Sequence, residues 1–452
     1  MKETMEFELF RVKLFTAAVD KGFKDCEVFY ASGAMFSLKV FEGELREYKS
    51  AGNAGLSFRG TYRNGKMGYA YTERLGEDII PFLVDNAAQN AEIIEDTDTE
   101  EIFAGSPSYP QVNTWDESLA KLPAADKIAI ALKVEQAAKA ADPRVKGVDW
   151  CGLSSSEGEV RIANSLGLNL YERTNFAGVW SVPRVQGDDG QLKQQGDVWA
   201  GKDFAFFDAV AFGRYTAELA LSHLGAKSIP TGKYAVILTG TAMSDLLRCF
   251  SSVFSAEQAQ KGFSLLKGKI GTQVGSAALS IRDDPFLDQM PGSSAFDCEG
   301  VATRNKLIIE NGVFHSFLHN RKTAKKDGVA PTGNASKRSF KSSVGIGPTN
   351  FYIVPSDKTQ VALMAELGEG LLIDSLEGLH SGANPVSGDF SVSAEGHEIH
   401  EGKKGRAVEQ ITLAGNFFTL LQDVAAVAAD LEFKDRVSSP SVWVRELNVS
   451  GL

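Results

Sequence analysis

Metal chemistry in this chain would depend first on its six histidines, because imidazole is a common metal ligand in proteins. His315 and His319 are four residues apart, a spacing that would place both rings on one face of a helix. The Asn311-Gly312 pair, however, predicts a β-hairpin over 308–317. In extended backbone the two residues would lie about 13 Å apart, too far to share one ion. We therefore interpret both histidines as structural residues.

Three further histidines lie towards the C-terminal end. His397 and His400 flank Glu398 at the expected tip of a hairpin, and His380 precedes them. A metal held by His380, His397 and His400 across that tip is conceivable, but the segment has no cysteine and its spacing does not match a helical zinc motif. The simpler interpretation is a polar loop, so no bound metal or other cofactor is expected.

One cluster of carboxylates could bind a hard cation. Asp283, Asp284 and Asp288 are close in sequence, and such ions prefer carboxylate oxygens. Pro285 and the glycines that follow favour a surface turn instead.

Cysteine chemistry has little support in the sequence. Cys26, Cys151, Cys249 and Cys298 are far apart and form no CxxC pair, which excludes a zinc ribbon or a redox motif. Cys249 could act as a nucleophile only beside a base, and His223, the nearest in sequence, belongs to a different predicted helix. We interpret Cys249 as a small buried residue.

Apolar spacing and turn residues predict the elements that would position these groups. Helices are expected over 7–22, 77–94, 125–141, 208–225, 242–254, 360–368 and 417–431. Strands are expected over 27–31, 34–41, 54–59, 67–72, 147–154, 159–164, 169–182, 234–239, 351–355, 371–376, 389–394, 405–413 and 441–447. Strands outnumber helices and hairpins outnumber crossovers, so the predicted fold class is α+β with antiparallel or mixed sheets.

The chain is long enough for two or three domains. The stretch 95–109 is acidic and then rich in Gly, Ser and Pro, which predicts a linker. We expect an N-terminal α+β subdomain over 1–95, a middle α+β subdomain over 110–227 and a β-rich C-terminal domain over 230–452.

The amino-acid composition argues against some classes of binding partner and some cellular locations for this chain. The net charge is −11, so the chain lacks the basic footprint of a nucleic-acid-binding protein. The charged N-terminus has no apolar run typical of a secretory signal, and no stretch approaches 18 apolar residues, so neither export nor a membrane span is expected. Four separate thiols suit a reducing cytoplasm.

Two C-terminal stretches are similar to a known signature. The first, Gly378 to Gly396, reads Gly-Leu-His-Ser-Gly-Ala-Asn-Pro-Val-Ser-Gly-Asp-Phe-Ser-Val-Ser-Ala-Glu-Gly, and the second, Val408 to Phe417, reads Val-Glu-Gln-Ile-Thr-Leu-Ala-Gly-Asn-Phe. They resemble the C-terminal signature of the PmbA/TldD family, the so-called modulators of DNA gyrase. Weaker similarities at 51–59, 65–70 and 162–167 follow in the order expected for that family.

Active members of this family carry the motif HExxxH on a helix, where two imidazoles and a carboxylate can hold zinc and activate water. Counting back from Gly262 to Gly271, which resembles the segment after the motif, places Leu247, Arg248 and Ser252 at the first His, the Glu and the second His. Leucine cannot bind zinc, arginine cannot serve as a base at neutral pH, and serine is a poor ligand. The cysteine that completes the family's zinc site is also missing from Gly378 to Gly396.

Without these ligands the chain resembles the PmbA, or TldE-like, branch of the family and not the TldD branch. The resemblance implies a homodimer, or a heterodimer with a TldD-like subunit that holds the zinc. It also implies a C-terminal cleft for unfolded peptide. The residues that this resemblance places near the cleft are Asp297, Glu299, Asn334, His380, Ser381, Asn384 and Asp389.

Three functions are compatible with these observations. The chain could be a non-catalytic subunit of a cytoplasmic zinc metalloprotease that acts on unfolded peptides. It could be a metallopeptidase active by itself through relocated ligands such as His380, His397 and His400. It could also be a homodimeric peptide-binding module without a protease partner.

Overall fold

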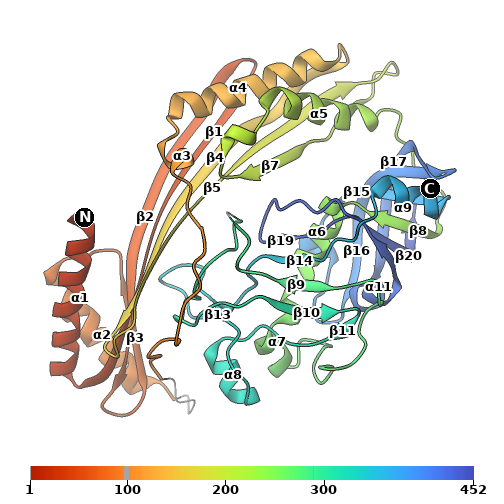
Figure 1. Cartoon of the computed structure of the whole chain (residues 1–452). Coiled ribbons are helices and arrows are strands. Elements are labelled where there is room, and N and C mark those ends of the chain that lie inside the picture. The colour runs from red at the N-terminus through yellow and green to blue at the C-terminus, as the bar shows by residue number, and fades with distance from the viewer. Residues whose placement is uncertain (1, 96–100, 289) are drawn as a thin grey trace.

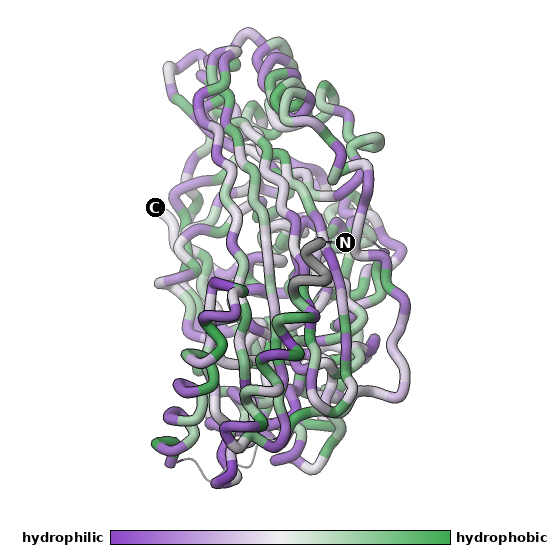
Figure 2. The backbone as a smooth tube through the Cα atoms, turned by 90° about the vertical axis from the view of Figure 1, so that its left-hand side faces the viewer, coloured by the Kyte–Doolittle hydropathy of each residue, from purple (hydrophilic) through white to green (hydrophobic). Residues whose placement is uncertain are grey.

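A long antiparallel sheet forms the first half of the chain. The computed structural model describes residues 2–95, 101–288 and 290–452 (Figure 1). Seven strands pair in the order β3-β2-β1-β4-β5-β6, and β7 pairs with β5. The strands are β1 (Phe23–Phe41), β2 (Glu44–Tyr62), β3 (Met67–Thr72), β4 (Val145–Asn164), β5 (Asn169–Gln186), β6 (Leu192–Gln194) and β7 (Asp197–Gly201). Strands of 18 to 20 residues such as β1, β2, β4 and β5 are about 60 Å long, and they run almost the full height of the molecule (Figure 2).

Two groups of helices cover one face of this sheet at opposite ends (Figure 1). The helices are α1 (Lys2–Lys21), the 3-10 helix η1 (Glu77–Ile79), α2 (Ile80–Ile93), α3 (Glu117–Lys121), α4 (Ala124–Ala141), the 3-10 helix η2 (Phe204–Phe206) and α5 (Ala209–Ser222). Apolar residues of α1 and α2 pack with Val28 and Phe58 of the sheet, whereas those of α4 and α5 pack with Leu38 and Leu153. The helix-covered face of the sheet is thus stabilised by two separate cores.

The long strands differ from the sequence-based prediction. Two strands around Ser32-Gly33 were expected, but β1 continues through this pair, and β4 likewise joins the strands expected over 147–154 and 159–164. Gly33 faces Asn53 on β2 and Gly158 on β4. Because strands on both sides supply hydrogen-bond partners, the ladder outweighs the tendency of glycine to end a strand.

The C-terminal part contains three sheets of its own. A six-stranded sheet has the order β17-β16-β15-β8-β20-β18, a five-stranded sheet has the order β11-β10-β9-β14-β19, and β12 pairs with β13 in a two-stranded sheet. The strands of this part are β8 (Gly232–Leu238), β9 (Ile281–Asp283), β10 (Lys306–Glu310), β11 (Val313–Phe314), β12 (Ala335–Ser336), β13 (Gly345–Ile346), β14 (Phe351–Ile353), β15 (Gly370–Glu377), β16 (Asp389–His400), β17 (Lys403–Asn416), β18 (Val424–Val427), β19 (Val437–Ser438) and β20 (Val442–Ser450). Its helices are α6 (Gly240–Phe250), the 3-10 helix η3 (Ser251–Phe254), α7 (Ala256–Gln260), α8 (Arg321–Asp327), α9 (Gln360–Leu367), α10 (Leu379–Gly382) and α11 (Phe417–Asp423). One apolar core contains side chains of the two larger sheets and of α6.

The helix expected over 417–431 is wrong in its second half. Helix α11 ends at Asp423, and β18 follows at once. Val424 and Val427 pair with Val444 and Val442 of β20. The predicted helix is replaced because these β-branched residues gain both a ladder of hydrogen bonds and burial in the core.

The predicted α+β class with antiparallel and mixed sheets and a β-rich C-terminal part is confirmed. Strands from 1–95 and from 110–227 pair through β1 and β4 into one sheet, and the C-terminal part packs against the face of this sheet opposite the helices (Figure 1). Phe296 and Phe340 of the C-terminal part share a core with Phe29 and Ile162 of the sheet. Throughout the described ranges, no helix combines the length and apolar character needed to cross a bilayer.

Candidate functional site

Helix α6 carries the three positions at which the family's zinc motif would stand. It begins after Thr239, whose hydroxyl accepts a hydrogen bond from the backbone N–H of Ala242 at 3.4 Å. Leu247 is fully buried, in the same apolar core as Leu246 and Phe250. The helix is therefore held by apolar contacts at the position that would have to present a histidine to a metal.

The other two positions offer no metal ligand either. The Arg248 guanidinium lies 2.9 Å from Asp245 and 3.3 Å from Asp435, forming two ion pairs. Ser252 is exposed in η3, after α6 has ended. An apolar side chain, a cation and a neutral hydroxyl do not fit a zinc ion. No zinc-dependent step can be assigned to α6.

Cys249 lies on the same helix but lacks the surroundings of a nucleophile. Its Sγ is 3.9 Å from the carbonyl oxygen of Leu379 in α10. Burial raises the pKa of the Cys249 thiol, so the thiolate is disfavoured at neutral pH. The contact also shows that the signature segment after Gly378 packs against α6.

Four of the predicted cleft residues are exposed around α10 and the start of β16. They are His380, Ser381, Asn384 and Asp389. Asn384 Oδ1 accepts a hydrogen bond from the backbone N–H of Val386 at 3.0 Å. Asn416 donates to Asp389 at 2.9 Å, and this hydrogen bond helps to lower the pKa of Asp389. These side chains are available to a ligand, in contrast to the other three predicted cleft residues.

Asp297, Glu299 and Asn334 are buried and bound to neighbouring protein groups. Asp297 accepts hydrogen bonds from the backbone N–H groups of Glu299, Val301 and Ala335 at 2.9 to 3.0 Å. Glu299 accepts one from the backbone of Arg321 at 2.8 Å. These hydrogen bonds hold loops in place. The three side chains therefore have structural contacts and do not form an exposed wall of a cleft.

Asp283 is the centre of a buried network on β9. Its two oxygens accept hydrogen bonds from Lys306 Nζ at 2.7 Å, Asn334 Nδ2 at 2.8 Å, and the Thr349 backbone N–H and hydroxyl at 2.7 and 2.9 Å. Burial lowers the pKa of Lys306 and outweighs the opposing effect of Asp283. The prediction that this segment forms a surface turn is therefore wrong for two of its residues. Asp283 is fully buried, and Asp284 is also buried.

We expect the carboxyl group of Asp297 to make the stability of the protein depend on pH. Burial and the neighbouring Glu299 charge raise the pKa of Asp297 to about 7. A group with a raised folded-state pKa stabilises the protein at low pH, and this contribution is lost as the pH rises through 7. Between pH 6 and pH 8, Asp297 should therefore remove about 1.4 kcal/mol from the free energy of unfolding.

Urea denaturation of the wild type and of Asp297→Asn at both pH values measures this effect. Burial also lowers the pKa of Lys202 and of Lys337 to about 8, which acts in the opposite direction, but both lysines are present in both proteins. For each protein, the free energy of unfolding changes between pH 6 and pH 8. The difference between these two changes therefore measures the contribution of Asp297, and equal changes would contradict the prediction.

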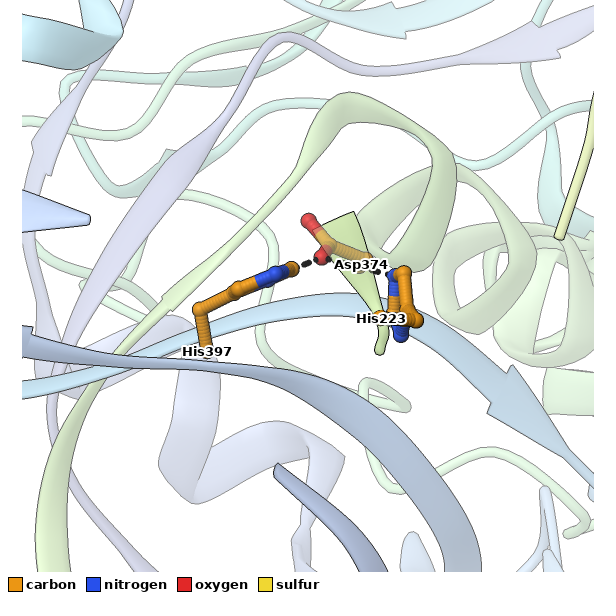
Figure 3. A group of neighbouring side chains, drawn as sticks. All are labelled: His223, Asp374 and His397. Atoms are coloured by element: carbon orange, nitrogen blue, oxygen red, sulfur yellow. Dashed lines mark hydrogen bonds and ion pairs between the residues drawn. The ribbon is translucent and has the colours of Figure 1, made fainter. Parts of the chain in front are cut away.

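One group of possible metal ligands is brought together by tertiary structure (Figure 3). It comprises His223 at the C-terminal end of α5, Asp374 on β15 and His397 on β16. Asp374 Oδ2 lies 2.7 Å from His397 Nδ1 and 3.5 Å from His223 Nε2. Within the described ranges, this is the group of three His, Cys, Asp or Glu residues whose potential ligand atoms converge, all within 4.8 Å of one another.

The electrostatics of this group favour an ionised carboxylate. Burial opposes ionisation of Asp374, but the neighbouring rings of His223 and His397 and the charge of Lys404 outweigh it and lower the pKa of Asp374. His397 Nε2 donates to the carbonyl oxygen of Ser222 at 3.0 Å. His397 is therefore held at both ring nitrogens, which fixes the orientation of its ring.

The remaining histidines lie elsewhere. His400 is exposed and pairs with Glu369 at 3.0 Å, and His380 is exposed on α10. His315 pairs with Glu310 at 3.2 Å, whereas His319 is buried. Of the set His380, His397 and His400, only His397 belongs to the group of converging ligands.

Sequence reasoning missed His223 and Asp374 as partners of His397. Asp374 is a single carboxylate within the apolar run 371–376, which is an unusual place for a charge and could have been noticed. Nothing in the sequence relates it to His223, because their contact depends on how the C-terminal end of α5 meets the C-terminal sheet.

Family models match three consecutive parts of the chain. Residues 26–91 match domain 1, residues 117–224 the central domain and residues 231–451 the C-terminal domain of the PmbA/TldA metallopeptidases. A metalloprotease PmbA homolog of Haemophilus influenzae is 27% identical over 429 residues, covering 93% of this chain and 90% of that protein. A metalloprotease of Methanothermobacter thermautotrophicus is 27% identical over 408 residues, covering 87% and 86%.

Solved structures agree with these matches. A Thermotoga maritima protein described as a modulator of a DNA gyrase is 33% identical with a TM-score of 0.91, covering 98% of this chain and all of that one. TldE from Thermococcus kodakarensis, at 21% identity, shows the same fold with a TM-score of 0.88 over 98% of this chain and 100% of its own. Together with the signature segments that pack around α6, these similarities show that the chain belongs to the PmbA/TldD family.

Proposed function

We propose that this chain is a PmbA/TldE-like subunit of a cytoplasmic zinc metalloprotease system that acts on unfolded peptides, and that it holds no catalytic zinc itself. The observation that supports this most directly is α6, where fully buried Leu247 takes the place of the first zinc ligand. In this proposal the chemistry belongs to a zinc-bearing TldD-like partner. The present chain acts as a structural subunit, and its exposed residues around α10 contribute to peptide binding.

Several features support the cellular setting. Four free cysteines, of which Cys26 and Cys151 are buried, suit a reducing cytoplasm. The net charge of −11 disfavours direct binding to nucleic acid. The proposed partners are therefore a second protein chain, as a homodimer or with a TldD-like subunit, and an unfolded peptide.

Cleavage of fluorescein-labelled, unfolded casein tests the proposal. We expect the purified chain alone to cleave no casein, because the three positions of the zinc motif hold neither a histidine nor a carboxylate. A mixture with a TldD-like chain from the same source should cleave it. Replacing the Glu of HExxxH in that partner by Gln should abolish cleavage, because it removes the base that acts on zinc-bound water.

The other functions give different results in the same experiment. EDTA-sensitive cleavage by this chain alone would overturn the proposal and indicate a metallopeptidase active by itself. Failure to co-purify with a TldD-like chain, with peptide binding by a homodimer, would instead indicate a peptide-binding module without a protease partner.

A further inference from the structure

We propose that His223, Asp374 and His397 form a zinc site that clasps the end of α5 to the C-terminal sheet. None of the three residues belongs to α6, although the N-cap residue of α6, Thr239, donates a hydrogen bond to the carbonyl oxygen of Asp374 at 3.1 Å. The inference goes beyond the proposed function, which holds or fails independently of it. Zn²⁺ is the ion that fits best, because two imidazoles and one carboxylate suit zinc, whereas Mg²⁺ and Ca²⁺ prefer all-oxygen sites.

The spacing of the ligand atoms is close to that of a zinc site. Zinc binds nitrogen and oxygen ligands at about 2.0–2.2 Å, so atoms at two corners of a tetrahedron lie about 3.4 Å apart. Asp374 Oδ2 is 2.7 Å from His397 Nδ1 and 3.5 Å from His223 Nε2, and all three ligand atoms lie within 4.8 Å of one another. Small side-chain movements would bring them to metal-binding distances.

A second, independent observation is the unsatisfied ring nitrogen of His223. This residue is 2% exposed, and its Nε2 has no hydrogen-bond partner although it points toward Asp374 (Figure 3). A buried polar atom without a partner is costly. A metal ion between His223 and Asp374 would satisfy it.

The surroundings orient the imidazoles as metal sites commonly do. A metal-binding histidine usually donates its second ring N–H to a carbonyl or carboxylate. His397 Nε2 donates to the carbonyl oxygen of Ser222 at 3.0 Å, which leaves Nδ1 for the metal. His223 Nδ1 lies 4.0 Å from the Glu395 carboxylate, on the side of the ring away from Nε2.

The site is next to an opening to solvent. His223 and Glu395 line a pocket of about 450 Å³ together with Arg184, Leu192, Lys193, Gln194 and Glu409. This pocket provides an entry path for the ion and water for a fourth coordination position. Three cations lie nearby. Lys193 pairs with Glu409, and Arg184 pairs with Asp149 at 3.3 Å. Lys404 is 4.0 Å from Asp374, so it forms an ion pair without a close hydrogen bond.

Zinc at this place would join two parts of the molecule. His223 follows α5, which packs on the long sheet, whereas Asp374 and His397 belong to the C-terminal sheet. An ion that binds only the folded arrangement stabilises it by mass action. Zinc should therefore raise the melting temperature, and this readout does not depend on peptidase activity.

The test uses the untagged, full-length chain treated with a chelator and dialysed. ICP-MS after equilibration with ZnCl₂ should find one zinc per chain, with a rise in melting temperature. Co²⁺ in place of Zn²⁺ should give the visible absorption bands of a four- or five-coordinate ion. His223→Gln and Asp374→Asn should each weaken zinc binding by at least about 10-fold, and the matched control His400→Gln, an exposed histidine outside the group, should not.

Each outcome bears on the proposal. No zinc bound by the wild type, or one zinc retained with unchanged affinity in both His223→Gln and Asp374→Asn, would overturn it. If one variant fails to fold, the second variant and the Co²⁺ spectrum of the wild type still decide. Casein cleavage is measured separately, so a failed zinc site and a failed subunit role give distinguishable results.

Discussion

Replacing Asp283 with alanine is expected to lower the free energy of unfolding by about 3–5 kcal/mol, because it leaves a buried charge without its partner. Lys306 is bound to Asp283 at 2.7 Å, and both side chains are almost completely buried. Asn334 and Thr349 would also lose their acceptor. The loss should exceed that of an ordinary hydrogen bond several-fold.

Urea denaturation of Asp283→Ala measures this effect. Asp288→Ala is the matched control, because Asp288 is exposed in the same segment and should change stability by less than about 0.5 kcal/mol. The double variant Asp283→Leu with Lys306→Met should be more stable than Asp283→Ala, because it removes both charges. A loss below 1 kcal/mol for Asp283→Ala would contradict the importance of this network.

Rebuilding the zinc motif is expected to destabilise the protein without creating a peptidase. In the triple variant Leu247→His, Arg248→Glu and Ser252→His, the first imidazole would enter an apolar core, where it has no hydrogen-bond partner. Leu247 is fully buried, so the free energy of unfolding should fall by about 3 kcal/mol. No activity should appear, because the cysteine ligand of the family's zinc site is still missing from 378–396.

Thermal unfolding and casein cleavage with added ZnCl₂ test the triple variant. Leu247→Met is the control, because a hydrophobic residue of similar volume should cost less than about 1.5 kcal/mol. Zinc-dependent cleavage by the triple variant alone would refute the argument that both parts of the zinc site have been lost.

Local signals predicted several elements well. The asparagine-glycine pairs at Asn64-Gly65 and Asn311-Gly312 both form the expected turns, and Asn311 and Gly312 have φ values of 48° and 80°. A tight hairpin turn requires such left-handed backbone, which these residue types adopt at low cost. The helix expected over 125–141 is α4, Ala124–Ala141.

Errors arose where distant strands decide the local structure. The backbone at Gly33 is extended because β2 and β4 pair with it from both sides. Residues after Asp423 form β18 because β20 lies beside them. In both places the local residues permit two structures, and the hydrogen bonds from a distant strand select one.

The sequence by itself determined the α+β class, the family resemblance and the absence of histidine over 242–262, because these depend on residue types and their order. Only the tertiary structure decided which polar residues act together. Asp283 became the centre of a buried network, and His223 met Asp374 and His397 across the junction of α5 with the C-terminal sheet. Such contacts are absent from single-sequence patterns because they arise from packing between segments that are far apart along the chain.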